Sequence, residues 1–477
     1  MPPDPAPEIR SARDVVELVN SGTAKGQNSR AIVLIALGGI FIDAYDFTSI
    51  SFGLPDISKQ FGLDAFMIGV VGAAIMVGAL VGALAGGYLI DKLGRYRLFM
   101  ADMLFFVVSA IGCGLAPEEW SLIVFRFLMG IGIGIDFPVA LAFIAEYTAL
   151  RGKGGRVSLW QPMWYVATSA TFAFLIPLYY LVPTDDLWRW IVGLGALPAL
   201  VVMLVRHRYM EESPAWAANQ GDLERAAEIL HKSYGLRVTV APDADRTPVV
   251  HRQPSVREFA RLFTPQYRRR TIVAGTVGIC QSMQYFAVGF TLPTIISGIL
   301  DQGRIETILG SLIFNLVFGI TGGFLGVALT YRLGSWWLAT SGFAVCVVVL
   351  PLLAGIGHPD GTAWTVAVGA LLGVFVFFHS YGPGAQGMTM ATLSYPTSIR
   401  GLGAGFSQAF LRVGATVSLL AFPQLSDAMG ENSFYIVALA PAIGLIVLLL
   451  IRWEPVGKDI DAEDYQQADQ PTTVEAI

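Results

Sequence analysis

Charged residues are scarce in this chain. Only 31 basic and 36 acidic residues occur among 477, or 14%, whereas an ordinary soluble protein is about a quarter charged, which would be roughly 119 residues here. Hydrophobic residues make up 54% of the chain, and the mean hydropathy is +0.59. A soluble enzyme of this length would lack the polar surface that it needs, and a disordered chain is excluded as well.

An excess of positive charge is also missing. The formal net charge is -5 and the isoelectric point is near 5.6, which argues against a nucleic-acid-binding protein because such a protein needs a basic face for phosphates. The three cysteines, Cys113, Cys280 and Cys346, all lie inside apolar runs. We therefore interpret them as small buried hydrophobic residues and not as a disulfide framework.

Sequence signatures of catalysis and of bound cofactors are absent. The chain contains no HExxH, GxSxG or Cys/His metal-binding spacing, and no GxxxxGK[ST] loop,. The sequence therefore predicts no enzyme, no metal site, no cofactor and no nucleotide-driven pump.

Long apolar runs, in contrast, are abundant. A bilayer core about 30 Å thick needs roughly 20 predominantly apolar residues per helix, and twelve runs of about that length recur. They lie at 30–52, 66–90, 97–116, 119–147, 157–181, 188–205, 271–298, 305–329, 335–356, 363–391, 401–425 and 432–452. The predicted fold class is an all-α membrane protein with twelve transmembrane helices.

Basic residues gather in alternate loops between these runs. They occur at 92–97, 151–156 and 268–270, whereas the other loops hold only Lys59, Arg189 and Arg304. The positive-inside rule then predicts an inner (plasma) membrane protein with both termini in the cytoplasm. The predicted parts are a cytoplasmic N-terminal tail 1–29, an N-terminal six-helix bundle 30–205, a cytoplasmic linker 206–270, a C-terminal six-helix bundle 271–452 and a cytoplasmic tail 453–477.

The two predicted bundles look like a duplication. Gly87-Tyr-Leu-Ile-Asp-Lys-Leu-Gly-Arg95 compares with Val327-Ala-Leu-Thr-Tyr-Arg-Leu-Gly-Ser335, and Gly-Ile-Gly at 132–134 compares with Gly-Pro-Gly at 382–384. Charge is unequal between the halves, because Asp136 corresponds to Gln386. Paired halves around a midplane cavity are the organisation expected of a secondary transporter.

Four segments resemble signatures of the major facilitator superfamily. They are Gly-x3-Asp-Lys-x-Gly-Arg-x-Arg (87–97), Arg-x3-Gly-x-Gly-x-Gly (126–134), Glu-Glu-Ser-Pro-Ala-Trp (211–216) and Tyr-Pro-Thr-x-x-Arg-Gly (395–401). The last two are typical of its sugar-porter-like branch, which includes bacterial inner-membrane metabolite:proton symporters. The resemblance implies two pseudo-symmetric six-helix bundles and transport by alternating access.

Ionisable residues within the predicted spans are candidates for proton coupling, because such side chains are costly in a membrane and usually line a water-filled path. Asp43 and Asp46 are three residues apart, so both carboxylates lie on one face of a helix. The resemblance implies that Asp46 serves proton coupling and that Arg126 pairs with it; a static buried ion pair is the alternative. Asp136 is either a third proton-path residue or a carboxylate satisfied by a neighbouring hydroxyl or amide.

Charged residues also cluster at the predicted cytoplasmic ends of the helices. The resemblance implies that they form a gate, a latch of charge-assisted hydrogen bonds between the bundles that breaks when the protein opens inward. Simple positive-inside anchoring is the alternative. The predicted gate residues are Asp91, Arg95, Glu146, Arg151 and Arg400.

A substrate pocket is predicted from polar and aromatic residues in mid-membrane positions. The resemblance implies that Gln161 and Gln281 hydrogen-bond the substrate, with helix-to-helix bonding as the alternative role. Met388 stands where sugar porters have a stacking tryptophan, which counts against a true sugar carrier. The full predicted set is Gln161, Gln281, Trp164, Tyr165, Gln284, Tyr285, Met388 and Gln408.

These observations predict a secondary active transporter, a monomer that carries a small polar organic metabolite together with protons. The substrate is an organic or aromatic acid, or a sugar or polyol. Symport of phosphate or another inorganic anion with protons is an alternative, because Asp43-Ala-Tyr-Asp46 and Asp136-Phe-Pro138 resemble motifs of phosphate:proton symporters. Proton-driven export is the other alternative.

Overall fold

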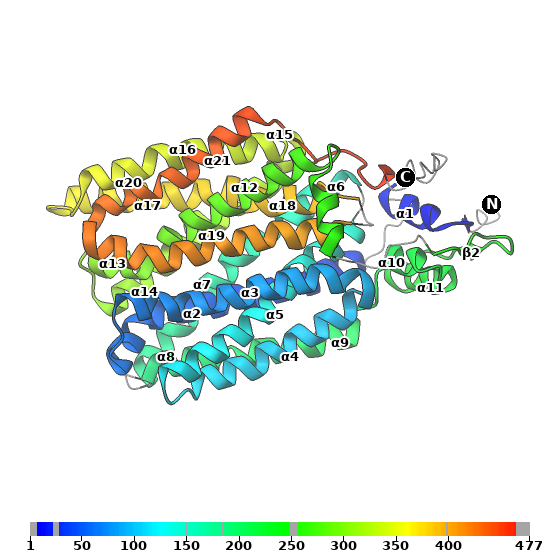
Figure 1. The fold of residues 1–477 in the computed structure, drawn as a ribbon. Helices are drawn as coiled ribbons and strands as arrows, with labels where there is room; N and C mark the ends of the chain where they lie inside the picture. The colour runs from blue at the N-terminus through cyan, green and yellow to red at the C-terminus, as the bar shows by residue number, and fades with distance from the viewer. Residues whose placement is uncertain are drawn as a thin grey trace.

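The computed structural model describes residues 7–21, 28–148, 150–182, 186–248, 256–396 and 399–463. Side chains are described for all of these except 28–32, 86–88, 90–92, 138, 142, 150–152 and 256–258. The described chain is almost entirely helical, and its long helices run side by side in two bundles (Figure 1).

The N-terminal bundle contains six crossings, the last two of which are each built from two consecutive helices. Its elements are α2 (Asn28–Phe61), α3 (Ala65–Leu93), α4 (Arg95–Gly114), α5 (Glu119–Glu146), α6 (Leu150–Ser158) with α7 (Trp160–Leu181), and α8 (Leu187–Gly193) with α9 (Ala196–Tyr209).

The C-terminal bundle also contains six crossings, several of them interrupted. Its elements are α12 (Arg268–Gln284), η3 (Tyr285–Gly289) and α13 (Leu292–Gly298); α14 (Arg304–Ile313), η4 (Phe314–Gly319) and α15 (Ile320–Leu333); α16 (Ser335–Ile356); α17 (Thr362–His379), η5 (Ser380–Gly384) and α18 (Ala385–Leu393); α19 (Arg400–Met429); and η6 (Gly430–Asn432), α20 (Ser433–Val437) and α21 (Leu439–Leu450).

Ten described helical segments are long and apolar enough to cross a membrane. The last of them, Arg400–Leu450, has 51 residues and would be roughly 76 Å long as one helix, so it holds two crossings, α19 and α20–α21. The more polar segment α12–α13 adds the twelfth. Large apolar side chains such as Leu104, Phe174 and Leu449 are exposed on the outside of the bundles, as lipid-facing residues are. The predicted all-α fold of twelve helices is confirmed.

Three helices of the C-terminal bundle contain a π-helical segment, namely η3, η4 and η5. A proline within η5, Pro383, cannot donate to the helical ladder, which accounts for the irregular turn there,. Such segments widen the helix locally and are frequent at functional sites. Tyr285 lies in η3, and His379 immediately precedes η5, so both irregular turns border the centre of the molecule.

A small layer covers one end of the bundles, and the described terminal segments lie there (Figure 1). We call this end the terminal end and the opposite end the far end. The layer consists of β1 (Glu8–Ile9), α1 (Ala12–Asn20), α10 (Pro214–Asn219), α11 (Leu223–Tyr234), β2 (Thr239–Val240) and η2 (Val256–Phe263). β1 and β2 pair in parallel, with Glu8 opposite Thr239, so the segment before α1 is joined to the segment that follows the sixth crossing.

Glycines allow α3 and α5 to pack with their backbones in contact. A Cβ at Gly78 would lie 2.0 Å from the Phe127 carbonyl oxygen, and a Cβ at Gly134 would lie 2.2 Å from the Ala79 carbonyl oxygen. Small residues at helix interfaces are a usual means of close packing in membranes. This seam holds the second and fourth crossings at a fixed distance and so positions the side chains of α5.

Replacement of Gly78 tests whether this seam is required. Gly78→Val should destabilise the protein strongly, because its Cβ cannot be placed without moving the α5 backbone,. We expect the melting temperature in detergent to fall by several degrees. The matched control is Gly72→Ala in the same helix, whose Cβ would be 3.9 Å from the nearest atom, a methyl carbon of Leu419. Equal stability of both variants would contradict the packing argument.

Candidate functional site

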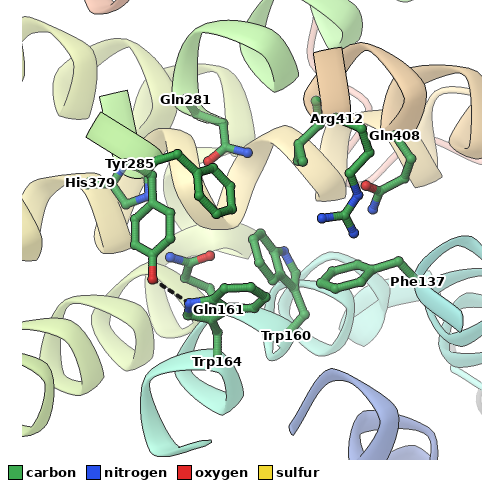
Figure 2. Close-up of a pocket in the computed structure, with 11 residues that line it drawn as sticks. Phe137, Trp160, Gln161, Trp164, Gln281, Tyr285, His379, Gln408 and Arg412 are labelled. Atoms are coloured by element: carbon green, nitrogen blue, oxygen red, sulfur yellow. Dashed lines mark hydrogen bonds between the residues drawn. The ribbon is translucent and has the colours of Figure 1, made fainter. Parts of the chain in front are cut away.

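A small cavity lies between the two bundles near the middle of the molecule (Figure 2). Its volume is ≈ 30 Å³, which is room for a water molecule and not for a metabolite. It is lined by Phe137, Trp160, Gln161, Trp164, Gln281, Tyr285, Phe286, His379, Gln408, Leu411 and Arg412. Because every one of these side chains is buried, the structure represents a closed form of the protein.

Aromatic side chains form much of the cavity wall. The Trp164 indole N–H donates to the Tyr285 hydroxyl at 2.6 Å, so this bond connects α7 to η3 across the bundle interface (Figure 2). Trp160 donates to the carbonyl oxygen of Ala385 at 3.2 Å. The His379 ring stacks on Tyr285, with centroids 5.1 Å apart. Rings from both bundles therefore meet at the cavity.

Five of the eight predicted substrate residues line this cavity. They are Gln161, Trp164, Gln281, Tyr285 and Gln408. Gln161 approaches the cavity closely because Gly384 has no side chain; a Cβ there would lie 2.7 Å from the Gln161 amide nitrogen. The Oε1 atoms of Gln161 and Gln408 are buried without a hydrogen-bond partner, so both amides keep an acceptor for another molecule.

The other three predicted substrate residues do not line the cavity. Gln284 is directed at His379, with its Nε2 3.0 Å from the ring Nδ1. The Met388 sulfur accepts from the Gln408 amide at 2.6 Å, so Met388 lies behind a cavity residue. The Tyr165 ring packs against Gly319. These three residues are close to the cavity along the chain, but the sequence alone does not show which face of each helix points toward it.

The two carboxylates of α2 are buried and unpartnered. Asp43 is 0% exposed and Asp46 is 2% exposed. None of their four carboxylate oxygens has a hydrogen-bond partner. An ionised carboxylate in such surroundings is costly.

Arg126 does not pair with Asp46, contrary to the prediction. Its Nε donates to the Val71 carbonyl oxygen at 2.6 Å, and its Nη2 donates to the Gly72 carbonyl oxygen at 3.3 Å. No ion pair joins it to Asp46 among the described residues. In this closed form the arginine is held by the backbone of α3, because those two carbonyl groups can accept bonds from outside their own helix.

Asp136 belongs to a buried ion cluster that sequence reasoning missed. Its carboxylate lies 2.8 Å from Nη1 of Arg206, and the same Nη1 lies 3.3 Å from Asp102. Arg206 also stands over the Phe99 ring at 4.2 Å. Asp136 is therefore matched by a guanidinium and not by a hydroxyl or amide. Arg206 was missed because the predicted helix ended at residue 205, whereas α9 continues to Tyr209.

The two bundles are joined at the terminal end by charges. Lys153 of α6 lies 3.0 Å from the Asp461 carboxylate, and Arg400 of α19 pairs with the same carboxylate. All three side chains are at most 7% exposed. Arg400, a predicted gate residue, thus reaches the other bundle through Asp461, which follows the last crossing.

The remaining predicted gate residues have other arrangements. Arg95 and Glu146 form a buried ion pair at 2.7 Å, but both belong to the N-terminal bundle, so this pair fixes α4 to α5 and does not bridge the bundles. The side chains of Asp91 and Arg151 lie outside the described residues.

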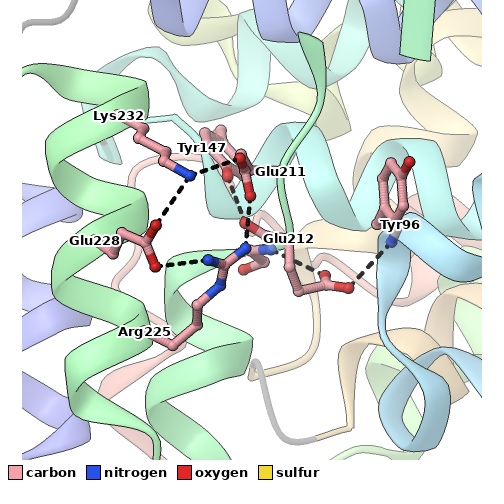
Figure 3. A network of polar contacts seen from close by, with 8 residues as sticks. Tyr96, Tyr147, Glu211, Glu212, Arg225, Glu228 and Lys232 are labelled. Carbon is pink, nitrogen blue, oxygen red and sulfur yellow. Dashed lines mark hydrogen bonds and ion pairs between the residues drawn. The ribbon is translucent and has the colours of Figure 1, made fainter. Parts of the chain in front are cut away.

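Glu212 attaches the segment after the sixth crossing to the start of α4 (Figure 3). Its carboxylate accepts from the backbone N–H groups of Arg95 at 3.0 Å and Tyr96 at 3.2 Å, which are otherwise orphan donors of a helix start. Gly94 has φ +88°, and a Cβ there would lie 2.3 Å from the carboxylate. Burial raises the pKa of the Glu212 carboxyl, whereas Arg95 and the backbone donors act in the opposite direction.

The C-terminal bundle repeats this cap. Glu454 accepts from the Trp336 backbone N–H and from the Ser335 hydroxyl, both at 2.8 Å. Gly334 has φ +84°, and a Cβ there would lie 2.3 Å from the Glu454 carboxylate. The internal repeat seen in the sequence therefore extends to equivalent carboxylate caps after the sixth and twelfth crossings.

A second network holds the linker helices together (Figure 3). Glu211 pairs with Arg225 at 2.7 Å and with Lys232 at 3.2 Å. Glu228 pairs with the same two cations, and their hydrogen bonds lower the pKa of its carboxyl. These side chains are partly exposed, so the network orders α11 against α10 without adding much stability.

An ion pair between the two bundles closes the far end. Asp56 of α2 pairs with Arg304 of α14, and Arg304 stands over the Phe52 ring at 5.4 Å. A vestibule of ≈ 200 Å³ borders this pair and is lined also by Pro293 and Thr307. Both ends of the central cavity are therefore closed by charges from opposite bundles.

Metal ligands do not gather in the part of the chain that the structure describes. No group of three or more His, Cys, Asp or Glu residues there could hold a metal ion.

Comparison with known proteins identifies the family. Residues 31–465 match the family model described as "Sugar (and other) transporter". The chain is 30% identical over 441 residues to the putative metabolite transport protein YaaU of Escherichia coli, covering 90% of this chain and 93% of that protein. It is 27% identical over 430 residues to the inner membrane metabolite transport protein YgcS of the same organism, covering 90% and 91%.

The fold is similar to a solved transporter. The proton:xylose symporter XylE, solved with 6-bromo-6-deoxy-D-glucose, superposes with a TM-score of 0.75 at 17% identity, covering 94% of this chain and 99% of that chain. The chain therefore belongs to the sugar (and other) transporter family, and its fold is that of the major facilitator superfamily. It is a multi-pass membrane transporter and not an enzyme, and the predicted resemblance is confirmed.

The charge bridge at the terminal end can be tested by cysteine labelling. Asp461→Asn removes the carboxylate that Lys153 and Arg400 share, so we expect the terminal end to open more often. The reporter cysteine is Ser158→Cys, a buried position on the same helix as Lys153, where Ser158 contacts Thr389 of the other bundle. Its alkylation rate in the purified protein should rise several-fold.

The control for this experiment is Glu463→Gln. Glu463 lies on the same tail but pairs with Arg270 of its own bundle, so it should leave the alkylation rate unchanged. If Asp461→Asn has no effect, or if both variants have equal effects, the bridge does not hold the terminal end closed.

Proposed function

We propose that this member of the sugar (and other) transporter family couples the inward movement of protons to the uptake of a small polar organic metabolite. The observation that carries the proposal is the pair Asp43 and Asp46, buried in α2 with four unpartnered carboxylate oxygens. Carboxylic groups in such surroundings suit a cycle of proton uptake and release. The solved xylose symporter with the same fold is itself named as a proton symporter.

The route for the proton follows α2 toward the terminal end. Asp46 and Asp43 are one helical turn apart, and Asp136 lies against Gly39, the next turn of the same helix; a Cβ at Gly39 would be 1.9 Å from the Asp136 carboxylate. Asp136 then leads to Arg206. We assign Asp46 and Asp43 as the proton-binding groups and Asp136 as the group that passes the proton onward.

Arg126 is the switching partner in this proposal. In the closed form it is bound to two carbonyl groups of α3, so Asp46 has no cation within ion-pair distance among the described residues. A movement of α5 or α3 that releases Arg126 would let it reach Asp46 and favour loss of the proton. A membrane potential of about 100 mV supplies about 2.3 kcal/mol per charge moved. This free energy is enough to sustain roughly a fifty-fold ratio of substrate concentrations across the membrane.

Alternating access is supported by the two closures. The Lys153–Asp461–Arg400 bridge closes the terminal end and the Asp56–Arg304 pair closes the far end. Each is made of charged groups that water can solvate when the bundles separate. The central cavity, lined by a single chain, needs no second copy, and we therefore assign the monomer as the transporting unit.

The substrate class follows from the lining of the cavity. Amides from Gln161, Gln281 and Gln408 offer donors and acceptors,, while rings form the rest of the wall. Such a wall favours a carbon-containing solute over inorganic phosphate, since stacking and apolar contact do nothing for a phosphate ion. Several relatives are named as metabolite transport proteins, which agrees with this class.

Orientation in the membrane gives the first test. We place the terminal end, with both termini and the linker, in the cytoplasm of a cell whose plasma membrane holds the protein. Arg237→Cys in the linker should resist an impermeant thiol reagent in intact cells, whereas Gln302→Cys at the far end should react; both positions are exposed. The native cysteines are buried. The reverse labelling pattern would contradict this orientation.

Proton coupling gives the second test. Asp46→Asn removes the proton-binding group but keeps the size of the side chain, so we expect uphill accumulation in energised vesicles to vanish while exchange of substrate down its gradient continues. The matched control, Asp427→Asn, changes an exposed carboxylate of α19 and should accumulate substrate like the unmodified protein. An Asp46→Asn variant that still concentrates substrate, and still loses it on addition of an uncoupler, would refute the assignment.

A further inference from the structure

We propose that the transported solute is a small aromatic carboxylate and that its carboxylate group is bound by Arg412. This inference rests on the proposed transport function and adds the chemical class of the substrate. It is carried by one juxtaposition: a buried guanidinium, which no described carboxylate contacts as an ion pair, lies on a cavity walled by aromatic rings.

Arg412 is a buried cation that forms no ion pair with a carboxylate in the described part of the chain. Its side chain, on α19, is 2% exposed, and its Nε has no hydrogen-bond partner. The one contact of its Nη1 that is within reach of a hydrogen bond is the Met76 sulfur at 3.9 Å, a weak acceptor. No ion pair joins it to any carboxylate that the structure describes.

The other two arginines buried within the membrane-spanning helices near the cavity have strong partners for part of their guanidinium groups, although Nη1 of Arg126 and Nε of Arg206 have none. Arg126 donates to two backbone carbonyl groups, and Arg206 lies between two carboxylates. A buried charge without such partners is costly. This cost is offset when the partner of the charge is part of the substrate. Of the three arginines, Arg412 alone lines the cavity.

The position of the guanidinium suits a carboxylate joined to a ring. Figure 2 shows it directed from α19 toward the space beside Trp160, and its carbon lies 5.2 Å from the centroid of the Phe137 ring. The planar fork of arginine matches a carboxylate through two parallel hydrogen bonds. Trp164, Tyr285 and Phe286 form the wall beyond it, where edge or face contacts with an aromatic ring add affinity.

Glutamines complete the site. Gln408 stands one helical turn before Arg412 on the same face of α19, and Gln281 lines the cavity from the neighbouring helix α12 (Figure 2). Their amides can bind hydroxyl or ring-nitrogen substituents of the solute. Because the closed cavity has only ≈ 30 Å³ and benzene needs a cavity of about 150 Å³, the walls must move apart when the solute is bound.

Asp43 connects this carboxylate site to the proton. The charged groups that interact electrostatically with Asp43 are Asp136, Arg412, Asp46 and Arg206. The acidic group that interacts electrostatically with Arg412 is Asp43. A substrate carboxylate and an ionised Asp43 would therefore compete for the same cation. Proton binding by Asp43 leaves Arg412 available to the substrate, so one proton and one carboxylate enter together and the buried charge stays constant.

The test is equilibrium binding by calorimetry to the purified full-length protein, with benzoate, its neutral analogue benzamide, the non-aromatic carboxylate lactate, and D-xylose as probes. We expect benzoate to bind best. Arg412→Gln should weaken benzoate binding by roughly 30- to 100-fold, the effect of losing a charged hydrogen-bonding partner. Arg412→Lys keeps the charge but not the fork and should recover part of the affinity. Benzamide binding should be nearly the same in all three proteins.

The matched control is Arg332→Gln, which removes one positive charge from an exposed position of α15 and should not change benzoate binding. Melting temperatures establish that each variant is folded, and if Arg412→Gln does not fold, the comparison of Arg412→Lys with the unmodified protein decides. Benzoate affinity that is unchanged in the Arg412 variants, or binding of D-xylose without any binding of benzoate or lactate, overturns the inference. Neither result would affect the Asp46→Asn transport test. Conversely, benzoate binding without uphill transport would overturn only the proposed proton coupling.

Discussion

The burial of charge inside an apolar bundle is the constraint on which this structure depends. Asp43, Asp46 and Asp136 are at most 2% exposed, as are Arg126 and Arg412, although the chain has few charged residues in total. Each such group costs several kcal/mol on insertion into a membrane unless it finds a partner or water. The buried charges differ in the partners that the fold gives them. This difference distinguishes structural charges from functional ones.

Three kinds of treatment can be distinguished. Arg206 is matched by two carboxylates through its Nη1 and joins α9 to α4 and α5. Arg126 is matched by backbone carbonyl groups, which hold it in one place without neutralising it. Asp43, Asp46 and Arg412 lack strong partners in this closed form. Only the last kind can exchange a proton or an anion without first breaking a strong interaction, whereas Asp136 must loosen its ion pair with Arg206 when it passes the proton onward.

Much of the fold could be predicted from the sequence, since twelve apolar runs of sufficient length leave few alternatives. The internal repeat in the sequence also corresponds to a repeated structure. Gly94 and Gly334 are equivalent in the two halves and both have positive φ. Beside them, Glu212 and Glu454 cap the following helices. The pairing partners were not predictable. Arg206 sits beside His207 and Arg208 and so looks like part of a basic loop, although its side chain is fully buried.

The sequence predicted at which level of the membrane-spanning helices the candidate site lies, but not which side chains face it. Gln161 and Gln281 face the cavity as expected, whereas Gln284 and Tyr165, close by on the same helices, face other helices. The π-helical turn at Tyr285 changes the angular position of the residues that follow it,, and no sequence pattern announces such a turn. Arg412 could be recognised from the sequence as a cation in a span, but its lack of a partner is a property of the packed structure alone.

The two closures differ in a way that bears on the transport cycle. The far end is closed by a pair within the repeated bundles, Asp56 and Arg304, while the terminal end depends on Asp461, which follows the last crossing and lies outside both bundles. When either end opens, water solvates the charged groups that were paired with each other. The net free energy of opening is therefore much smaller than the strength of the ion pairs. A bound substrate needs to contribute only a few kcal/mol of differential affinity to shift such an equilibrium. Because the C-terminal tail takes part in only one of the two closures, its contacts can change the balance between the open forms without altering the central cavity.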